Sequence, residues 1–472
     1  MTLGTKPGFP EVPSRRTVAV AGFVALFALL LVAAGRLQAA AESPAGRLVQ
    51  PSGKPGCIHR TGVNRCARGR AITSPQDIAI SPDGRHAYVA AYGSHAVSVF
   101  ERDARSGALS QLPGRRGCVS HGRAGTCAAG RGLGRPAAVA VSPDGRNVYV
   151  AASASRALAV FARNRRTGTL RQLDGANGCI SQFPEGGCTD GRALNEPVAV
   201  DVSSDGSRVL VASRRSPSAI AVLLRAADGT VTQAEGPAGC ISRAGFDGCA
   251  PARALRSPED VVVSRDGRSV LVASSGSQAV ASLRLGSSGP SQPAGAAGCI
   301  SNKGAGDCAV GRHLRGPVEL ALAPDGRWLY VASSISDAVA VVRRNRSTGE
   351  LSQARGRPGC VSQFGAGGRC GAGRMLDEVW SVAVSPDGKS LYTVSAKVNG
   401  LGVLARNPAT GGLDPLAGRR GCFIRAGVLG CPEGRGLTVA VAVTVSPDGR
   451  NVYVASEDSY LGAIAIFRRF VR

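Results

Sequence analysis

Aromatic and acidic residues are scarce in this sequence, and the short motifs that mark common enzyme families are absent. Aromatic residues make up 4% of the 472 residues, and 57 lysine and arginine residues outnumber 32 acidic ones, for a formal net charge of +25. No Gly-x-Ser-x-Gly elbow, His-Glu-x-x-His zinc motif or phosphate-binding loop is present. The sequence therefore offers no signature of an elbow-type serine hydrolase, a zinc peptidase or a P-loop nucleotidase.

Histidine is also scarce, and the five histidines form no cluster. None recurs with the cysteines, and no Cys-x-x-Cys spacing is present, so we expect neither a metal site nor a cofactor. His313 alone is expected near the candidate pocket described below. The five are His59, His86, His95, His121 and His313.

The N-terminus carries the one long apolar run. Residues 17–35 contain no charge, follow a basic flank that includes Arg15 and Arg16, and precede the small residues 39–41. This order predicts a targeting segment over residues 1–41, because the run is long for a signal peptide and just long enough to cross a bilayer. A cleaved signal peptide and an uncleaved anchor are both consistent with it. In either case residues 42–472 face outward, secreted or tethered at the cell surface by residues 17–35.

The fourteen cysteines fall into seven close pairs, which predict seven disulfides. The two cysteines of a pair are nine or ten residues apart, whereas neighbouring pairs are some fifty residues away, so each bridge is expected to close its own loop. Such a short loop contributes ~2.5–3 kcal/mol on the chain-entropy model. Disulfides in this number indicate export to an oxidising compartment. The pairs are Cys57–Cys66, Cys118–Cys127, Cys179–Cys188, Cys240–Cys249, Cys299–Cys308, Cys360–Cys370 and Cys422–Cys431.

Two markers repeat seven times, so the chain is an array of equivalent units. The first cysteines of the pairs recur every 59 to 62 residues, and an Asp-Gly turn recurs with them. In one unit, residues 139–141 enter a Pro-Asp-Gly turn, residues 148–152 return, and two further strands follow at 157–162 and 169–173. Four antiparallel strands that become more polar outward are typical of a propeller blade. We therefore predict an all-β, seven-bladed β-propeller with one disulfide loop per blade.

The two ends of the array predict how the ring closes. Residues 46–50 align with the fourth strand of the other units, and residues 463–468 align with a third strand. The N-terminus should therefore supply the outer strand of the last blade, which removes the open edges of the ring. Each unit also exceeds an ordinary blade by roughly 16–20 residues, and the cysteine pair lies in this excess. We expect these loops to form a crown on one face, opposite the Asp-Gly turns.

The motifs of the unit resemble those of a known family. The sequence SPDGRNVYVAA at 142–152, followed by ALAVF at 157–161 and TGTL at 167–170, is similar to the lactonase-like seven-bladed propellers. That family includes YVTN-repeat surface proteins and 6-phosphogluconolactonase-type enzymes. The resemblance covers residues 42–472 and implies the blade architecture, with a lactonase-like hydrolase or isomerase as one possible activity. Unlike the enzymatic members, this chain has no histidine where the first strand of a blade begins.

An arginine follows every second cysteine by four residues. A residue repeated in each blade is expected to be structural, and the five donors of arginine suit it to holding loop carbonyl groups. The alternative is a ring of arginines that binds an anion at the channel mouth. The seven are Arg70, Arg131, Arg192, Arg253, Arg312, Arg374 and Arg435.

Carboxylates break the symmetry of the repeat near the start of the first strand, where other blades have alanine or serine. We interpret them as the lining of a small-molecule pocket at the loop face of the channel, with Trp380 as a stacking platform. The alternative is that they balance the arginine ring. No catalytic residue can be assigned among them. They are Asp77, Asp201, Glu259, Asp260 and Glu319.

Basic residues gather in the predicted crown, at Arg60, Arg65, Arg68, Arg115, Arg116, Arg123, Arg419 and Arg420. An exported surface of this kind attracts an anionic envelope polymer or a lipid surface. Base-specific recognition of nucleic acid is not expected, because aromatic stacking groups are scarce there. We therefore favour a monomeric binding or scaffold propeller at the cell envelope, with the lactonase-like enzyme as the alternative.

Overall fold

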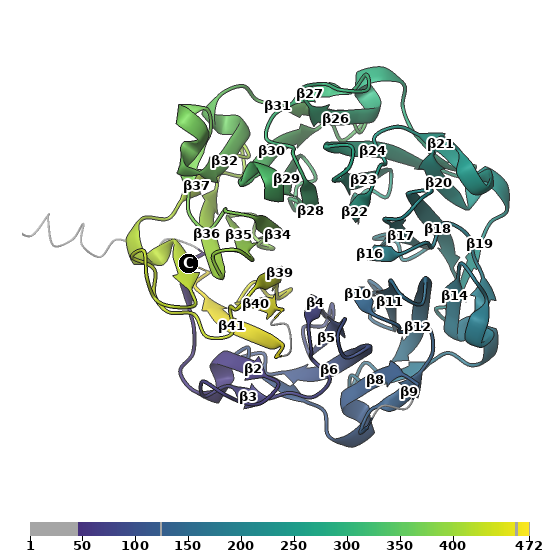
Figure 1. Cartoon of the computed structure of the whole chain (residues 1–472), viewed down its shortest axis with the longest axis horizontal. Helices are drawn as coiled ribbons and strands as arrows, with labels where there is room; N and C mark the ends of the chain where they lie inside the picture. The colour runs from purple at the N-terminus through teal and green to yellow at the C-terminus, as the bar shows by residue number, and fades with distance from the viewer. Residues whose placement is uncertain (1–45, 123–124, 458–460, 472) are drawn as a thin grey trace, which may run out of the picture. The chain divides into compact units, whose positions relative to one another are not determined.

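The computed structural model describes residues 46–122, 125–457 and 461–471, which form seven small β-sheets arranged in a ring (Figure 1). The predicted targeting segment and its boundary with the ring lie outside the described residues. The described part contains strands and short 3₁₀ segments, and none of its helices is long and apolar enough to cross a membrane. The predicted seven-bladed propeller is therefore confirmed.

Blade 1 shows the plan of each unit. From the centre outward, β4 (Pro75–Ile80), β5 (His86–Ala91) and β6 (Ala96–Arg102) are antiparallel neighbours. The outer position is shared by two short strands, β7 (Leu109–Gln111) and β8 (Cys118–His121), which pair with opposite halves of β6. The four predicted antiparallel positions are thus present, and the fourth is interrupted.

The other six blades repeat this plan around the channel (Figure 1). Their first strands are β10 (Pro136–Val141), β16 (Pro197–Val202), β22 (Pro258–Val263), β28 (Pro317–Leu322), β34 (Val379–Val384) and β39 (Ala440–Val445). Their second strands are β11 (Asn147–Ala152), β17 (Arg208–Ser213), β23 (Ser269–Ser274), β29 (Trp328–Ser333), β35 (Ser390–Ser395) and β40 (Asn451–Ser456). Their third strands are β12 (Ala157–Arg163), β18 (Ala219–Arg225), β24 (Ala279–Gly286), β30 (Ala338–Arg344), β36 (Gly400–Arg406) and β41 (Ala463–Arg469).

The hydrophobic core is divided into layers between neighbouring blades. One layer joins Tyr149 and Leu158 of blade 2 to Val209 and Val211 of blade 3. All six residues of β5 are buried, because a second strand is covered by a blade on each face. The second strands therefore read as continuous apolar runs rather than as an alternation of apolar and polar residues.

The ring closes through its N-terminal strand, as predicted. β1 (Leu48–Val49) pairs with β41, placing Leu48 opposite Arg469 and Val49 opposite Arg468. The backbone N–H of Gly46 also donates to the carbonyl of Phe470 at 2.9 Å. The last blade thereby gains its outer strand from the beginning of the chain, and no third strand is left with an open edge.

All seven predicted disulfides are present, and no cysteine is free. Each bridge joins a cysteine at the start of an outer strand to the cysteine that closes its own loop. The outer strands are β2 (Cys57–His59), β8, β14 (Cys179–Ser181), β20 (Cys240–Arg243), β26 (Cys299–Asn302), β32 (Cys360–Gln363) and β38 (Cys422–Ile424). Seven bridges of this kind indicate an oxidising, non-cytoplasmic location.

The disulfide loops lie partly along the outer edge of the ring, which the prediction of a crown on one face did not include (Figure 1). In six blades the chain after the second cysteine adds a short strand parallel to the cysteine strand, as β9 (Ala128–Gly130) does beside β8. In blade 6 a single bridge between Ile424 and Glu433 replaces that strand. In six blades the loops therefore cover the exposed edge of the sheet with a fifth strand.

A buried arginine at the end of the third strand anchors the Asp-Gly turn of the preceding blade. Arg163 of blade 2 donates two hydrogen bonds of 3.0 Å to the carboxylate of Asp83, and its Nε donates to the hydroxyl of Tyr88. The Arg163 side chain is 0% exposed and the Asp83 side chain 22%. Six junctions contain this ion pair: Arg102–Asp448, Arg163–Asp83, Arg225–Asp144, Arg344–Asp266, Arg406–Asp325 and Arg469–Asp387.

The junction between blades 3 and 4 lacks this ion pair. Leu285 occupies the position of the arginine, and Leu210 occupies that of the tyrosine. In the described part of the chain, Asp205 is hydrogen-bonded only within its own turn, by Ser203 and Ser207. The arginine and the tyrosine are therefore missing together at this junction, and Asp205 is a natural internal control for the other six turns.

Candidate functional site

The first strand of every blade lines the central channel, and each contains a β-bulge after its opening residue. In blade 1 the register shifts between Pro75 and Asp77, and the same shift occurs in the other six blades. One edge of this strand pairs with the second strand, so alternate backbone N–H groups on its other edge point into the channel and need acceptors. Side chains at the bulge are placed to supply them.

Asp77 and Asp260 supply acceptors that join neighbouring blades. Oδ1 of Asp77 accepts a hydrogen bond from the backbone N–H of Ile78 at 2.7 Å, and Oδ2 accepts one from Val139 of blade 2 at 2.8 Å. Asp260 makes the same two bonds between blades 4 and 5, each 2.8 Å long. These carboxylates therefore connect the innermost strands, a role that the sequence did not suggest.

Asp201 and Glu319 act at two other junctions. The oxygens of Asp201 accept hydrogen bonds of 2.8 Å from the backbone N–H groups of Val202 and Val263, between blades 3 and 4. Asp201 is two residues further along its strand than the other carboxylates, so it lies deeper in the channel. Glu319 of blade 5 is hydrogen-bonded by Ser381 of blade 6.

Burial raises the pKa of all four channel carboxylic acids, Asp77, Asp201, Asp260 and Glu319. The hydrogen bonds they accept offset only part of this effect. The pKa of Asp201 rises to about 6, and that of Asp260 rises to about 7 because burial is reinforced by the charges of Asp201 and Asp77. The pKa of Glu319 is raised well above its ordinary value by burial and then by Asp260. A carboxylic acid whose pKa is near the ambient pH can give or take a proton.

A cavity of about 260 Å³ opens at the channel mouth on the loop face. Its apolar lining comes from alanines and valines of blades 2, 3, 5 and 7 and from Trp380, which is 41% exposed. Its acidic lining consists of Asp77, Glu196, Glu259, Asp260 and Glu319. A cavity therefore lies beside four of the five carboxylates singled out in the sequence, whereas Asp201 does not line it, because it lies deeper along its strand. The cavity is somewhat smaller than the ~300–1,000 Å³ of pockets for drug-sized ligands.

Glu259 belongs to an ion-pair network at the rim of the cavity. Arg214 approaches Glu259 to 2.5 Å and Glu196 to 3.6 Å, and Arg215 lies 2.5 Å from Glu196. Ser275 donates a further hydrogen bond of 2.7 Å to Glu259. Sequence reasoning missed both arginines and Glu196. The signal for them was the adjacent arginine pair in the turn between the second and third strands of blade 3, where other blades lack it.

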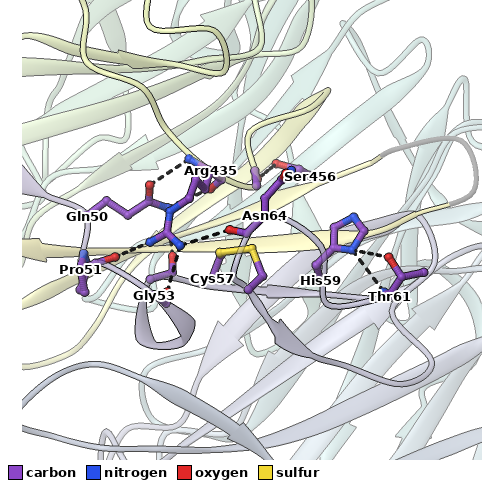
Figure 2. Close-up of a disulfide and its surroundings, with 12 residues drawn as sticks. Gln50, Pro51, Gly53, Cys57, His59, Thr61, Asn64, Arg435 and Ser456 are labelled. Carbon is purple, nitrogen blue, oxygen red and sulfur yellow. Dashed lines mark hydrogen bonds between the residues drawn. A yellow bond between two sulfur atoms is a disulfide. The ribbon is translucent and has the colours of Figure 1, made fainter.

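The seven repeated arginines lie between neighbouring blades at the outer edge of the ring rather than at the channel mouth. Figure 2 shows Arg435, whose backbone N–H donates to the side chain of Gln50 at 2.8 Å. Its guanidinium donates to the carbonyl groups of Pro51 and Gly53 at the start of the chain. These contacts favour the structural interpretation over an anion-binding ring.

The same contacts between an arginine, a glutamine side chain and two carbonyl groups recur in the other blades, with one exception. Arg70, for example, donates to the carbonyl groups of Leu112 at 2.9 Å and Gly114 at 3.1 Å. Arg374 is exposed, and Pro415 stands where the other blades have the partner glutamine. The glutamine–arginine pair therefore holds six of the seven connections between blades.

His313 lies beside the Cys360–Cys370 disulfide, not near the channel cavity as expected. Its ring nitrogen and the two sulfurs lie within 4.8 Å of one another. Both sulfurs are committed to the bridge, so these three residues are not a set of metal ligands. The connection that follows Arg312 places the histidine at the outer edge of the ring.

No family model and no curated protein matches this chain. Similar solved structures include the periplasmic gluconolactonase of Pseudomonas aeruginosa, with 18% identity, a TM-score of 0.50, and coverage of 80% of this chain and 95% of that one. A protein from Lactobacillus plantarum has 18% identity, a TM-score of 0.50, and coverage of 77% and 85%. A functionally unknown protein from Desulfotomaculum acetoxidans has 13% identity, a TM-score of 0.50, and coverage of 77% and 87%. At these identities the likeness concerns the fold alone, and that fold is the one the lactonase-like resemblance implied.

Proposed function

We propose that the ring is a binding module of the cell envelope that holds an anionic partner through its basic outer surface. The observation that carries this proposal is a set of exposed arginines that form no ion pair within the described part of the chain. They are Arg65, Arg68, Arg115, Arg116, Arg419 and Arg420. Six of the eleven ion pairs in the described residues are the buried turn anchors, so few carboxylates remain to balance the outer arginines.

The attraction is expected to be mostly screened Coulombic. The Debye length is about 8 Å at physiological ionic strength, so binding that depends on exposed arginines weakens as salt is added. The test measures retention of the protein on an immobilised soluble polyanion such as heparin across a salt series. One variant replaces Arg115, Arg116, Arg419 and Arg420 with alanine, and its matched control replaces Arg85, Arg146, Arg268 and Arg450, which follow the Asp-Gly turns.

We expect the first variant to elute at lower salt than the wild-type protein, and the control to elute close to it. Equal losses in both variants would mean that the charge acts diffusely and that the outer surface is no site. Retention that does not respond to salt would contradict the proposal outright.

A second candidate function rests on the channel cavity. Asp260 has a pKa of about 7 and lies with Glu319 and Trp380 around one small cavity, which is an arrangement suited to acid–base chemistry on a lactone or a sugar. The test is a screen of lactone hydrolysis with Asp260→Ala and Glu319→Ala as controls. Hydrolysis that both substitutions abolish, with the ring still folded, would favour the enzyme over the binding module.

A further inference from the structure

The large apolar side chains that the ring exposes are concentrated in its disulfide loops. Of the thirteen exposed large hydrophobic residues in the described part, six lie between paired cysteines: Val63, Phe183, Phe246, Phe364, Val428 and Leu429. Phe364 is 85% exposed and Leu429 is 68% exposed. The six residues come from five of the seven disulfide loops, so in five blades the loop exposes at least one large apolar side chain to solvent. We call these side chains the apolar tips.

All of these tips emerge on the same face of the ring. Each cysteine strand ends beside the turn that joins the second and third strands of its blade: the N–H of His121 donates to the carbonyl of His95 at 2.8 Å, and that of Gln363 donates to Asp337 at 2.9 Å. Equivalent bonds occur in the other five blades. These turns are at the opposite end of the strands from the Asp-Gly turns. The disulfide loops therefore leave the cysteine strands at this face of the ring, where the first strand of blade 6 begins beside Trp380.

Basic side chains accompany the apolar tips. Within or directly beside the same loops, exposed cations are present at Arg65, Arg243, Arg369 and Arg425, and the loop closed by Cys299 and Cys308 carries Lys303. Arg156, in the turn between β11 and β12, packs over the ring of Phe183 in the neighbouring loop, with 5.0 Å between the guanidinium carbon and the ring centroid. Apolar side chains interspersed with cations on one surface are typical of proteins that bind at the interface of an anionic bilayer.

We propose that this loop face docks on an anionic lipid bilayer, with the apolar tips inserted at the interface and the arginines against the headgroups. The proposal rests on the binding function proposed above and names its partner. A bilayer is flat and extended, so loops that leave the ring at one face can reach it together. The buried disulfides hold each loop close to the ring, which lowers the entropy lost when several tips bind at once.

Other occupants fit the loop face less well. A soluble polyanion would bind to the cations alone, and its binding would not involve the exposed side chain of Phe364. A protein partner is favoured by one contiguous apolar patch, whereas these tips are separated around the edge of the ring. The first described residues of the ring do not cover the loop face. Gly46 lies beside Phe470, at the end of β41 that adjoins the Asp-Gly turns on the opposite face.

The experiment compares binding of the oxidised, exported protein to vesicles of phosphatidylcholine alone and of phosphatidylcholine with phosphatidylglycerol. The test variant replaces Phe183, Phe246 and Phe364 with serine. The matched control replaces three exposed apolar residues outside the loops, Val49, Leu224 and Phe470, with serine. A Phe364→Trp variant reports insertion directly, because brominated lipids quench a tryptophan that enters the bilayer.

We expect the loop variant to lose about tenfold or more of its affinity for anionic vesicles, since each inserted phenylalanine accounts for at least that factor when fully buried. The control should bind as the wild-type protein does, and the added tryptophan at position 364 should be quenched. Unchanged heparin retention in the loop variant would show that the proposed polyanion binding survives separately. Equal vesicle binding by both variants, or no quenching, would overturn the lipid proposal while leaving the binding module intact. If the wild-type protein binds neither anionic vesicles nor heparin, the lipid proposal and the proposed binding function are both overturned.

Discussion

The turn aspartates offer a test in which the protein provides its own control. Asp83 and Asp205 make the same bonds within their turns: each accepts a hydrogen bond of 2.6 Å from the serine two residues before it, and one from a backbone N–H two residues after it. They differ in two respects: Asp205 also accepts a hydrogen bond of 2.8 Å from the hydroxyl of Ser207, and Asp83 instead receives the buried Arg163 of the next blade. Alanine at each position therefore removes the two shared turn contacts, Asp205→Ala also removes the exposed bond to Ser207, and only Asp83→Ala leaves a buried guanidinium without its carboxylate.

The expected difference follows from the surroundings of Arg163. The loss of the turn bonds costs about 1 kcal/mol in either variant. Breaking a buried ion pair by removing one partner costs about 3–5 kcal/mol. Arg163 keeps hydrogen bonds to Tyr88 at 2.7 Å and Gly145 at 2.8 Å, and Asp83 is partly exposed, so the lower end of that range applies. We expect Asp83→Ala to lower the free energy of unfolding by about 3 kcal/mol more than Asp205→Ala does.

Urea unfolding followed by circular dichroism, with the disulfides oxidised, measures this difference. A second substitution, Arg163→Met, in the Asp83→Ala protein removes the orphaned charge and should restore much of the lost stability. Equal destabilisation by Asp83→Ala and Asp205→Ala would refute the reasoning, and so would a double variant that is less stable than Asp83→Ala alone.

The stability that the Asp83–Arg163 ion pair contributes also depends on pH. Burial opposes ionisation of Asp83, but hydrogen bonds from Ser81, Arg85 and Arg163 outweigh it and lower the pKa of this carboxylate. A folded-state pKa below the unfolded value means that the stabilisation is present above about pH 4 and is lost as the pH falls through the folded-state pKa. The difference between Asp83→Ala and the wild-type protein should therefore shrink in acid.

Three further predictions concern the channel, the ring closure and the disulfides. Burial raises the pKa of Asp260 to about 7, so the stability that this side chain contributes is fully present below about pH 4 and is lost as the pH rises toward 7. Raising the pH from 4 to 8 should therefore favour Asp260→Asn over the wild-type protein by at least ~1.4 kcal/mol, the value of one pKa unit. A stability difference between the two proteins that stays constant across that range would contradict this prediction. Deleting residues 42–50 removes β1 and should lower the melting temperature markedly, whereas an unchanged melting temperature would mean that closure through β41 contributes little. Non-reducing peptide mapping should recover seven separately linked loops, and replacing Cys179 and Cys188 with serine should increase amide exchange in that loop without melting the ring, so a global loss of stability would be the opposing result.

The fold was predictable from sequence because its signals are local and repeated. Seven cysteine pairs and seven Asp-Gly turns keep one period, and each marks a turn or a loop within a single blade. The closure by residues 46–50 was also predictable, because a fourth-strand motif stands before the first complete blade and a third-strand motif ends the last one. The edge strand that follows the second cysteine in six blades was missed, because two or three residues such as Ala67–Arg68 are too few to show a strand periodicity.

The candidate site was less predictable, because its contacts join different blades. The sequence showed that Asp77 and Asp260 break the repeat, but not that their oxygens accept hydrogen bonds from strands some sixty residues away. The pairing of Arg163 with Asp83 was missed for the same reason, since the two residues are eighty positions apart. Sequence reasoning can find an asymmetric residue in a repeat, whereas its partner depends on how adjacent sheets pack.

The closure of the ring has a consequence for the order in which the protein folds. β1 is the first strand of the ring to be synthesised, and its partner β41 is the last, so β1 remains unpaired until the whole chain is available. The disulfide loops have the opposite character, because a separation of nine or ten residues lets each form as soon as its own segment is exposed to an oxidant. An exported chain can therefore acquire its covalent bonds blade by blade while the ring is still open. The final docking of β1 then serves as the completion step, one that a chain truncated at either end cannot take.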